Sequence, residues 1–195
     1  MAEAVAGFGP VSVAAVVLAA GGASRWDGDG HKLMADLGGR PVAAHALGAA
    51  AEAALDELVV VVGAVDLGVC LPEGATVLEN PDWASGQAGS LQVAVAHCRT
   101  VGHDAIVFGL ADTPGVPASA WRSVAEQPGE LVCATFGGRR RPPVKVAASL
   151  WPDLPADGDE GARALLAQQA SQVVEVVCPG EPRDIDTVED LRAWS

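Results

Sequence analysis

The pattern of apolar positions alternates along the chain between short continuous runs and longer stretches with helical spacing. Val13–Ala20 and Leu58–Val62 are apolar at every position, which is typical of strands buried on both faces of a parallel sheet. Because predicted strands and helices follow one another in turn, the pattern indicates an α/β fold with a mainly parallel sheet. Further strands are expected at Thr76–Glu79, Ala105–Leu110, Leu131–Phe136, Val144–Ala148 and Val173–Val177, and helices at Pro41–Ala54, Ser90–Arg99, Pro117–Gln127, Asp159–Gln169 and Thr187–Trp194.

Length and composition fit a single domain. At 195 residues the chain can bury a substantial core, and we expect one domain over residues 1–195, with residues 1–10 as a loose leader. Half of the residues are hydrophobic, which excludes a mostly disordered chain. The formal net charge of −13 argues against binding to nucleic acid or to an anionic membrane surface.

The cysteines and the first apolar segment indicate in which cellular compartment the protein is expected. The four cysteines, at positions 70, 98, 133 and 178, form no CxxC pair, so we expect reduced, buried thiols and no zinc site or disulfide framework. Val11–Gly21 has the apolar character of a signal-peptide core, but no basic region precedes it and it is too short to span a bilayer. We therefore expect a buried strand there and a cytoplasmic protein.

A glycine-rich turn follows the first predicted strand. The strand ends in Leu18-Ala19-Ala20, and Gly21-Gly22 come next, with Arg25 and Lys32 further on. In open α/β sheets ligands bind beyond the carboxyl ends of the strands. Backbone N–H groups of such a turn can approach a phosphate, while the two cations offset its charge. The turn matches neither GxxxxGK[ST] nor GxGxxG, and the alternative is an ordinary tight turn with a solvated arginine and lysine.

An aspartate closely follows the predicted strand Ala105–Leu110. Asp112 precedes Thr113-Pro114, and its carboxylate is expected at the same edge of the sheet as the glycine turn. Mg²⁺ takes one or two carboxylates together with substrate phosphates and waters, which makes Asp112 a candidate magnesium ligand. An aspartate before Thr-Pro can equally cap a turn, so both interpretations stay open at this point.

Two segments gather polar or small residues next to predicted helices. Asn80, Trp83, Gly86 and Ser90 precede a helix and could expose backbone donors at its N-terminus. The alternative is a strand-to-helix loop with the tryptophan as its hydrophobic plug. Further on, the basic run Arg139–Arg141 stands before Pro142-Pro143, where it forms either a solvated hairpin tip or a contact to an anionic acceptor.

The C-terminal third contains several acids that a helix can use. Asp159 is expected to cap the helix that contains Arg163. Thr187 and the acid at position 190 have the spacing of a capping box. Asp184 and Asp186 are needed for neither cap, so they are free to face a shared metal ion.

Together and in this order, these segments resemble the MobA/MocA-like NTP transferases, most closely the molybdenum cofactor cytidylyltransferases. The family pattern reads LAAGxSxRMG…K, NxxWxxGMxxSL, GDxP, GxxGxPV, GDxGAR and DIDTPEDL, and the matches extend over almost the whole chain. They are Leu18–Gly21 with Arg25 and Lys32; Asn80, Trp83, Gly86, Ser90 and Leu91; Asp112 and Pro114; Gly158, Asp159, Gly161, Ala162 and Arg163; and Asp184–Thr187 with Glu189-Asp190-Leu191.

The resemblance implies a three-layer Rossmann-like nucleotidyltransferase that uses Mg²⁺. The phosphate of an acceptor attacks a nucleoside triphosphate, with CTP favoured, and pyrophosphate leaves. The favoured acceptor is molybdopterin or the molybdenum cofactor, and a molybdoenzyme is a candidate partner. The resemblance assigns catalysis to Arg25, Lys32 and Asp112; nucleotide binding to Leu18, Ala19, Ala20, Gly21, Gly22, Lys32, Asn80, Gly86 and Ser90; acceptor binding to Asp159 and Arg163; and metal binding to Asp112, Asp186 and Asp184.

The sequence departs from the family pattern at two places. Ala23, Trp26 and Asp27 stand where Ser, Met and Gly are usual, and the loop is longer and carries Asp29 as a second extra acid. Arg141-Pro142-Pro143 replaces Gly-His-Pro. Three alternatives therefore stay open: GTP as the nucleotide, a sugar phosphate or other small phosphate as the acceptor, and a non-catalytic nucleotide- or cofactor-binding maturation partner of a molybdoenzyme.

Overall fold

The computed structural model describes residues 11–194, so the expected leader at residues 1–10 lies outside the described part. Its seven-stranded sheet has the order β5-β4-β1-β6-β8-β7-β9, and only β8 among these described strands runs antiparallel to its neighbours. The predicted mainly parallel α/β sheet is thereby confirmed. The strands are β1 (Val13–Ala19), β4 (Glu57–Val62), β5 (Thr76–Glu79), β6 (Ala105–Leu110), β7 (Leu131–Phe136), β8 (Arg139–Ala147) and β9 (Val174–Val177), and β2 (Asp36–Leu37) pairs with β3 (Arg40–Pro41) in a separate hairpin.

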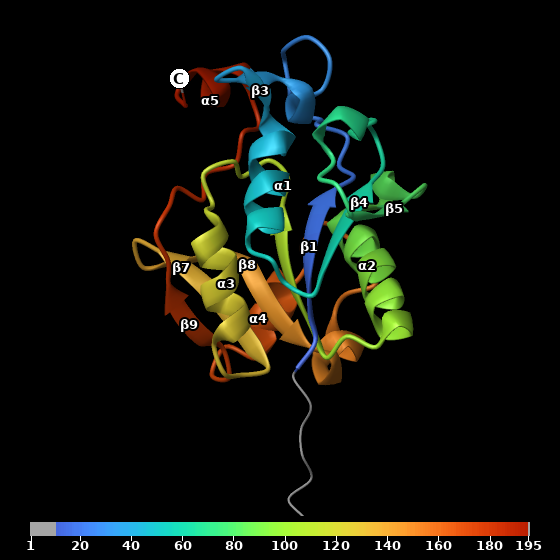
Figure 1. Cartoon of the computed structure of the whole chain (residues 1–195), viewed down its shortest axis with the longest axis vertical. Helices are drawn as coiled ribbons and strands as arrows, with labels where there is room; N and C mark the ends of the chain where they lie inside the picture. Colours follow the sequence, from blue (N-terminus) through green and yellow to red (C-terminus); the bar gives the residue numbers. More distant parts are fainter. Residues whose placement is uncertain (1–10, 195) are drawn as a thin grey trace, which may run out of the picture.

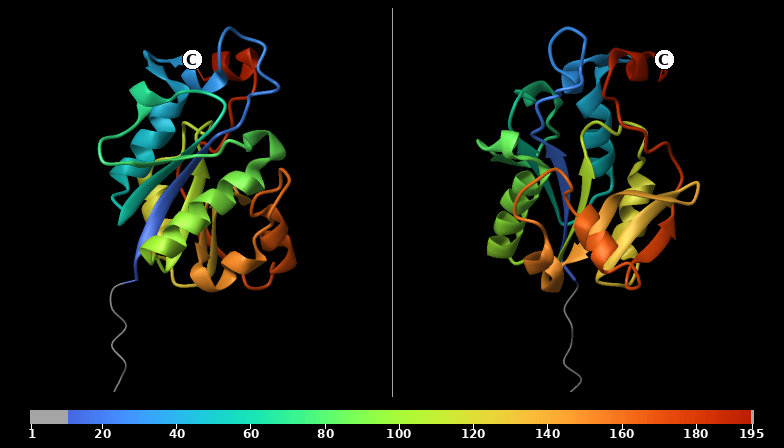
Figure 2. Two further views of the ribbon diagram at one scale, coloured as in Figure 1. Left: turned by 90° about the vertical axis from the view of Figure 1, so that its right-hand side faces the viewer. Right: turned by 180° about the vertical axis from the view of Figure 1, so that it is seen from behind.

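Helices cover both faces of the sheet and make three layers (Figures 1 and 2). Val17 of β1 belongs to the core shared with α1 and α3, while its neighbour Val16 belongs to the core shared with α2 and α4. Successive side chains of a strand point to opposite faces, so a run that is apolar at every position feeds both cores. The helices are α1 (Val42–Glu52), α2 (Gln87–Val101), α3 (Ala118–Glu126), α4 (Arg163–Gln168) and α5 (Val188–Arg192), with short 3-10 helices at Lys32–Met34, Gly68–Cys70, Trp83–Ser85 and Ala148–Asp153.

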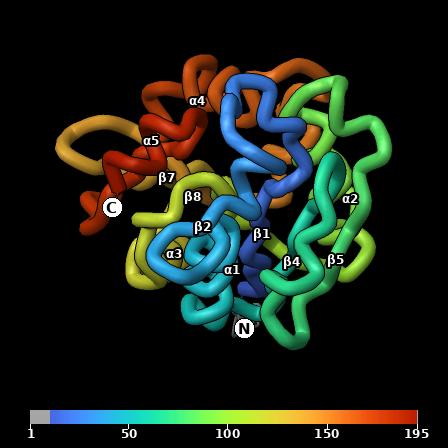
Figure 3. The backbone as a smooth tube through the Cα atoms, turned by 90° about the horizontal axis from the view of Figure 1, so that it is seen from above, coloured from blue at the N-terminus to red at the C-terminus, as the bar shows by residue number. Residues whose placement is uncertain are grey.

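The sheet changes winding direction between β1 and β6. From β1 the chain moves outward to β4 and β5, and then returns to form β6 on the other side of β1. The register pairs Leu18 with Leu110, so the glycine turn and Asp112 leave the sheet at the same edge. Figure 3 looks onto this edge and shows the loop after β1 lying across it, beside α5. A ligand site is expected at such a switch point.

The described residues confirm the expected burial of the cysteines. All four cysteines are buried and unbridged, as predicted. Burial raises the pKa of Cys98 to about 12 and that of Cys133 to about 11, so both thiols are unreactive near neutral pH. Within residues 11–194, no helix is long and apolar enough to cross a membrane.

The predicted cap at Asp159 is wrong. Helix α4 begins only at Arg163, and its N-cap residue is Ala162. Gly158 and Gly161 adopt positive φ angles of 87° and 52°, a left-handed conformation that cannot continue a right-handed helix. The segment is therefore a turn, and the helix is shorter than the pattern suggested.

The arginine run does not form a hairpin tip either. Gly137 and Gly138 make the β7–β8 turn with φ angles of 56° and 77°, the conformation that two-residue hairpin turns favour. The arginines consequently lie inside β8, which continues through Pro142-Pro143. Prolines fit there because the pairing of β8 with β7 is irregular between Cys133 and Ala134.

Candidate active site

Lys32 joins two aspartates at the switch point of the sheet. Its Nζ lies 2.7 Å from Asp112 Oδ2 and 2.8 Å from Asp186 Oδ1. The three side chains are only 12–18% exposed. Burial disfavours the lysine charge, but the charges of both carboxylates and the bonds to them outweigh burial and raise the pKa of Lys32. Lys32 is therefore a fixed cation in the free protein.

Arg25 contacts the same cluster from the loop after β1. Its guanidinium lies 2.9 Å from Asp186 Oδ2, so each oxygen of Asp186 faces a cation. Unlike Lys32, Arg25 is 72% exposed, and exposed ion pairs contribute little to stability. Arg25 can consequently turn toward a bound anion at low cost.

Asp112 and Asp186 fit a magnesium ion shared with a substrate. The second oxygen of Asp112, Oδ1, is buried and has no hydrogen-bond partner in the described part of the chain, a situation that costs free energy until a cation or donor reaches it. Residues 11–194 contain no group of three or more His, Cys, Asp or Glu side chains able to hold a metal by themselves. Two carboxylates plus phosphate oxygens and waters form the coordination that Mg²⁺ prefers.

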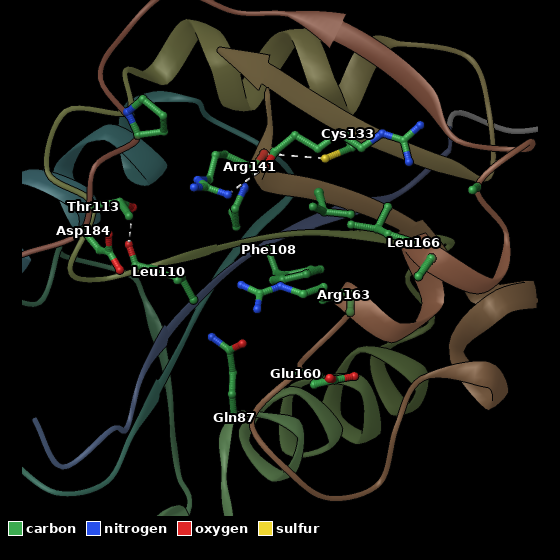
Figure 4. A pocket seen from close by; sticks show the side chains of 17 residues that line it. Gln87, Phe108, Leu110, Thr113, Cys133, Arg141, Glu160, Arg163, Leu166 and Asp184 are labelled. Atoms are coloured by element: carbon green, nitrogen blue, oxygen red, sulfur yellow. Dashed lines mark hydrogen bonds between the residues drawn. The ribbon is translucent and has the colours of Figure 1, made fainter. Parts of the chain in front are cut away.

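Asp184, the third predicted metal ligand, lines a cavity beside this cluster (Figure 4). Burial, together with the charges of Asp186 and Asp112, raises its pKa. The next residue in the chain, Ile185, donates its backbone N–H to the carbonyl of Asp112 at 2.9 Å and is fully buried. This bond fixes the C-terminal segment against the end of β6.

His31 is a site residue that the sequence did not reveal. Its Nε2 donates to the carbonyl of Gly21 at 2.9 Å, while its Nδ1 accepts from the N–H of Leu33 at 3.3 Å. Burial lowers the pKa of His31, so the neutral ring with its proton on Nε2 is favoured. The ring ties the glycine turn to the segment that carries Lys32. A lone histidine beside a lysine forms no spacing pattern, and no signal in the sequence identified it.

The side chain of Trp83 packs against the glycine turn. A Cβ on Gly63 would lie 2.8 Å from the backbone carbonyl oxygen of Ala20, so this glycine is required by close approach of the backbone. A Cβ on Gly22 would meet the ring of Trp83, so a larger residue there would displace that side chain. The indole of Trp83 is 36% exposed, so it is only in part the buried plug that the sequence suggested. The predicted lining residues Leu18, Ala19 and Ala20 are buried beneath the turn.

Asn80 and Ser90, two predicted nucleotide-binding residues, form a hydrogen bond with each other. Both side chains are buried, and Asn80 Nδ2 donates to Ser90 Oγ at 3.0 Å. Asn80 Oδ1 also accepts from the N–H of Asp82 at 3.1 Å. These bonds pin the loop to α2, and a contact from either side chain to a nucleotide stays a prediction.

Two of the sequence motifs meet at the N-terminus of α2. The N–H of Ala88 donates to the carbonyl of Gly158 at 2.9 Å. Gly86 has a φ angle of 116°, and a Cβ there would lie 2.5 Å from the same carbonyl group. This contact explains Gly86, whereas Gly158 has open space around its Cα and is favoured by its φ angle of 87°. The contact holds the turn before α4 beside the loop after β5.

A cavity of about 410 Å³ opens next to the aspartates (Figure 4). Phe108 and Leu110 line it from β6, and Arg141 from β8 and Arg163 from α4 face it. Arg163 therefore lines this cavity, and its role in acceptor binding stays a prediction. Asp159 does not line the cavity, although the next residue, Glu160, does.

The extra acid at position 27 is turned away from the glycine turn. Asp27 Oδ1 accepts from the backbone N–H of Val188 at 3.0 Å, at the start of α5. Trp26 packs against the small core that contains Leu37, Val42 and Ile185. The long loop is therefore held by the C-terminal segment, and this acid interacts favourably with the positive end of a helix.

Comparisons with known proteins identify a family and similar solved structures. The family model described as the MobA-like NTP transferase domain matches residues 15–173. A nucleotidyl transferase from Methanothermobacter thermautotroptrophicus (Mth528) is 25% identical, with a TM-score of 0.80 over 94% of this chain and 96% of that one. Rv0371c from Mycobacterium tuberculosis H37Rv is 25% identical, with a TM-score of 0.81 over 96% and 98%.

A second structure of Rv0371c, in complex with manganese, is 24% identical, with a TM-score of 0.77 over 94% of this chain and 98% of that one. Among curated proteins, none matches the sequence significantly. The family match includes the glycine turn, Lys32 and Asp112, and the matched structures extend over nearly the whole chain. The chain therefore belongs to the MobA-like NTP transferase domain family.

Proposed function

We propose that this protein is a Mg²⁺-dependent nucleotidyltransferase that joins CTP to a phosphorylated acceptor, molybdopterin or the molybdenum cofactor, and releases pyrophosphate. Nucleotidyltransferase chemistry follows from the family. The observation that carries the Mg²⁺ dependence is the state of Asp112, which shares Lys32 with Asp186 and keeps its other oxygen buried without a described partner. A carboxylate in that state favours a cation brought in with the substrate.

In the proposed reaction an oxygen of the acceptor phosphate attacks the α-phosphorus of the triphosphate. A new P–O bond forms, the bond from the α-phosphorus to the bridging oxygen breaks, and pyrophosphate leaves with the electron pair. A phosphate monoester is largely ionised at pH 7, so no strong general base is needed. The protein positions the two phosphates and neutralises their charge.

Each residue of the cluster has a separate task in this scheme. The N–H groups of Gly21 and Gly22 approach the triphosphate, and Lys32 and Arg25 offset its charge. Asp112 and Asp186 would hold Mg²⁺, which when bound supplies charge neutralisation and alignment of the phosphates. Rv0371c has been solved in complex with manganese, a cation that shares the preference of Mg²⁺ for oxygen ligands, and this supports the assignment.

The choice of CTP and of a pterin acceptor rests on the sequence resemblance. Gly158–Arg163 and Asp184–Thr187 match the family blocks GDxGAR and DIDT, which favour CTP over GTP. We place the reaction in the cytoplasm, where nucleoside triphosphates and reduced thiols are found, with a molybdoenzyme as the partner that takes the product. Because Asp27 is engaged with α5, the altered loop no longer favours a non-catalytic binder.

Pyrophosphate release tests the proposal. The protein is incubated with Mg²⁺ and molybdopterin or mature cofactor, and CTP, GTP, ATP and UTP are supplied in separate reactions. Release with CTP alone is expected. Release with GTP would replace the nucleotide assignment, and nucleotide binding without release under any of the four conditions would overturn the proposed reaction.

Replacement of Asp112 tests the metal assignment. Asp112→Asn keeps the shape of the side chain and removes its charge, and we expect kcat to fall on the order of 10²–10³-fold, the size of effect seen when one electrostatic group of an active site is lost. Asp153, an exposed acid of the 3-10 helix after β8, provides the control Asp153→Asn, which should retain activity. An Asp112→Asn variant as active as the control would sink the metal assignment.

A further inference from the structure

We propose that His31 is a positioning residue of the glycine turn, and that its hydrogen bond to Gly21 aims the backbone N–H of Gly22 at the triphosphate. This role rests on the proposed function, because it takes the triphosphate to bind at the turn. His31 belongs to none of the motifs that the sequence shares with the family, so its role has to come from its contacts.

The peptide unit between Gly21 and Gly22 is held from its carbonyl side. His31 Nε2 donates to the Gly21 carbonyl at 2.9 Å. A peptide unit is planar and almost always trans, so its C=O and N–H point in opposite directions. The bond to the Gly21 oxygen therefore sets the direction of the Gly22 N–H. The preceding carbonyl, of Ala20, is held in the same way by the N–H of Ala64 at 3.0 Å, and this bond sets the direction of the Gly21 N–H.

The two N–H groups of the turn are available to a ligand. Within residues 11–194, neither Gly21 nor Gly22 donates its N–H to a protein acceptor, and both residues are exposed. Donors fixed in place before the ligand arrives bind anionic oxygens without further reorganisation. Two successive glycines adopt many backbone conformations, so without His31 the peptide unit can turn its carbonyl toward the phosphates instead of its N–H.

His31 also joins this donor to the cation of the site. Its Nδ1 accepts from the N–H of Leu33 at 3.3 Å, which caps the 3-10 helix that begins at Lys32. Lys32 is held by the two aspartates, so the glycine turn is tied to a fixed point across the long loop between them. Burial lowers the pKa of His31. The ring is therefore neutral, and it contributes geometry rather than charge.

Two substitutions separate the two bonds of the ring. In His31→Asn the amide oxygen takes the place of Nδ1 and can still cap the 3-10 helix, but no donor reaches Gly21. In His31→Gln the side chain is one carbon longer, and its amide nitrogen takes the place of Nε2 and reaches the Gly21 carbonyl. If His31 served only as a cap, asparagine would replace it, whereas a residue that positions the peptide unit is replaced by glutamine.

Titration calorimetry with inorganic tripolyphosphate and MgCl₂ tests the role. We expect His31→Asn to weaken binding about tenfold, the usual effect of losing one bond to a charged group. His31→Gln should stay within about threefold of wild type, since it keeps the bond and loses only side-chain entropy. The control is His45→Asn, which removes the same kind of bond, from His45 Nε2 to the Leu37 carbonyl at 2.9 Å, and should bind like wild type. Unchanged melting temperatures verify that the variants fold.

A His31→Asn variant that binds like wild type would overturn the role of His31, and so would equal losses in His31→Asn and His31→Gln. Tripolyphosphate has neither a base nor an acceptor, so these ratios are independent of turnover. A wild-type protein that binds tripolyphosphate but releases no pyrophosphate in any reaction would instead contradict the proposed function, and the effect of His31 on phosphate binding would stand.

Discussion

Replacing Lys32 by Met removes the cation that the two aspartates share while keeping much of the length of the side chain. Lys32 Nζ bonds Asp112 at 2.7 Å and Asp186 at 2.8 Å, and all three side chains are at most 18% exposed. Removing one member of a buried ion pair costs about 3–5 kcal/mol, because the partner charge is left uncompensated. Since these groups keep some contact with solvent, we expect Lys32→Met to lower the free energy of unfolding by about 3 kcal/mol.

Arg25→Met is the matched control for this prediction. Arg25 pairs with the same carboxylate, Asp186, but is 72% exposed. Exposed ion pairs contribute about 0–1 kcal/mol, so this variant should remain within about 1 kcal/mol of wild type. Each variant removes one positive charge that pairs with Asp186, so the difference between their free energies of unfolding reflects the difference in burial.

Guanidinium unfolding with and without MgCl₂, at matched ionic strength, provides the assay. In wild type Lys32 competes with Mg²⁺ for the carboxylates, whereas in Lys32→Met they are open to the metal. Mg²⁺ should therefore stabilise the variant more than it stabilises wild type. At a Mg²⁺ concentration about a hundredfold above the Kd of the variant, the free energy of unfolding of the variant should rise by about 2.7 kcal/mol. Equal stabilisation of both proteins, or a loss below about 1 kcal/mol for Lys32→Met without metal, would refute the reasoning.

Three further changes test other contacts. Gly86→Ala should lower the free energy of unfolding in guanidinium by about 2–4 kcal/mol, because the φ angle of Gly86 is 116° and the new Cβ would lie 2.5 Å from a backbone carbonyl. Gly102→Ala is the control: its φ angle is 96° but the space around it is open, so the loss should be smaller. Although burial opposes its charge, hydrogen bonds from one threonine and two histidines lower the pKa of Glu57 from 4.5 to about 2. Its contribution to stability is therefore complete above pH 4.5 and lost as the pH falls toward 2, and melting temperatures of Glu57→Gln should depend less on pH across that window. Asp27→Ala removes the acceptor at the start of α5 and should cost about 1 kcal/mol in thermal unfolding, whereas no loss would show that the loop is held by packing alone.

The sequence by itself determined the layers of the fold and the edge of the sheet where the site lies. Buried strands such as Val13–Ala19 and Glu57–Val62 are visible as apolar runs because they are covered on both faces. The capping box of Thr187 and Asp190 is present as the spacing predicted, since a cap depends on residues within one helical turn. Asp112 could be placed at the edge of the sheet for the same reason, because only its own strand had to be recognised.

The tertiary structure alone decided which side chains meet. Lys32 and Asp186 are 154 positions apart, and their contact depends on how the C-terminal segment packs against the end of β6. Two further contacts join segments that no local spacing relates: the hydrogen bond from His31 to Gly21 and the capping of α5 by Asp27. The burial of Asp112 Oδ1 without a described partner also follows from the tertiary packing. Local patterns report backbone preference and burial, whereas the partner of a polar side chain is set by strand order and loop packing, which become defined only when the whole sheet has formed.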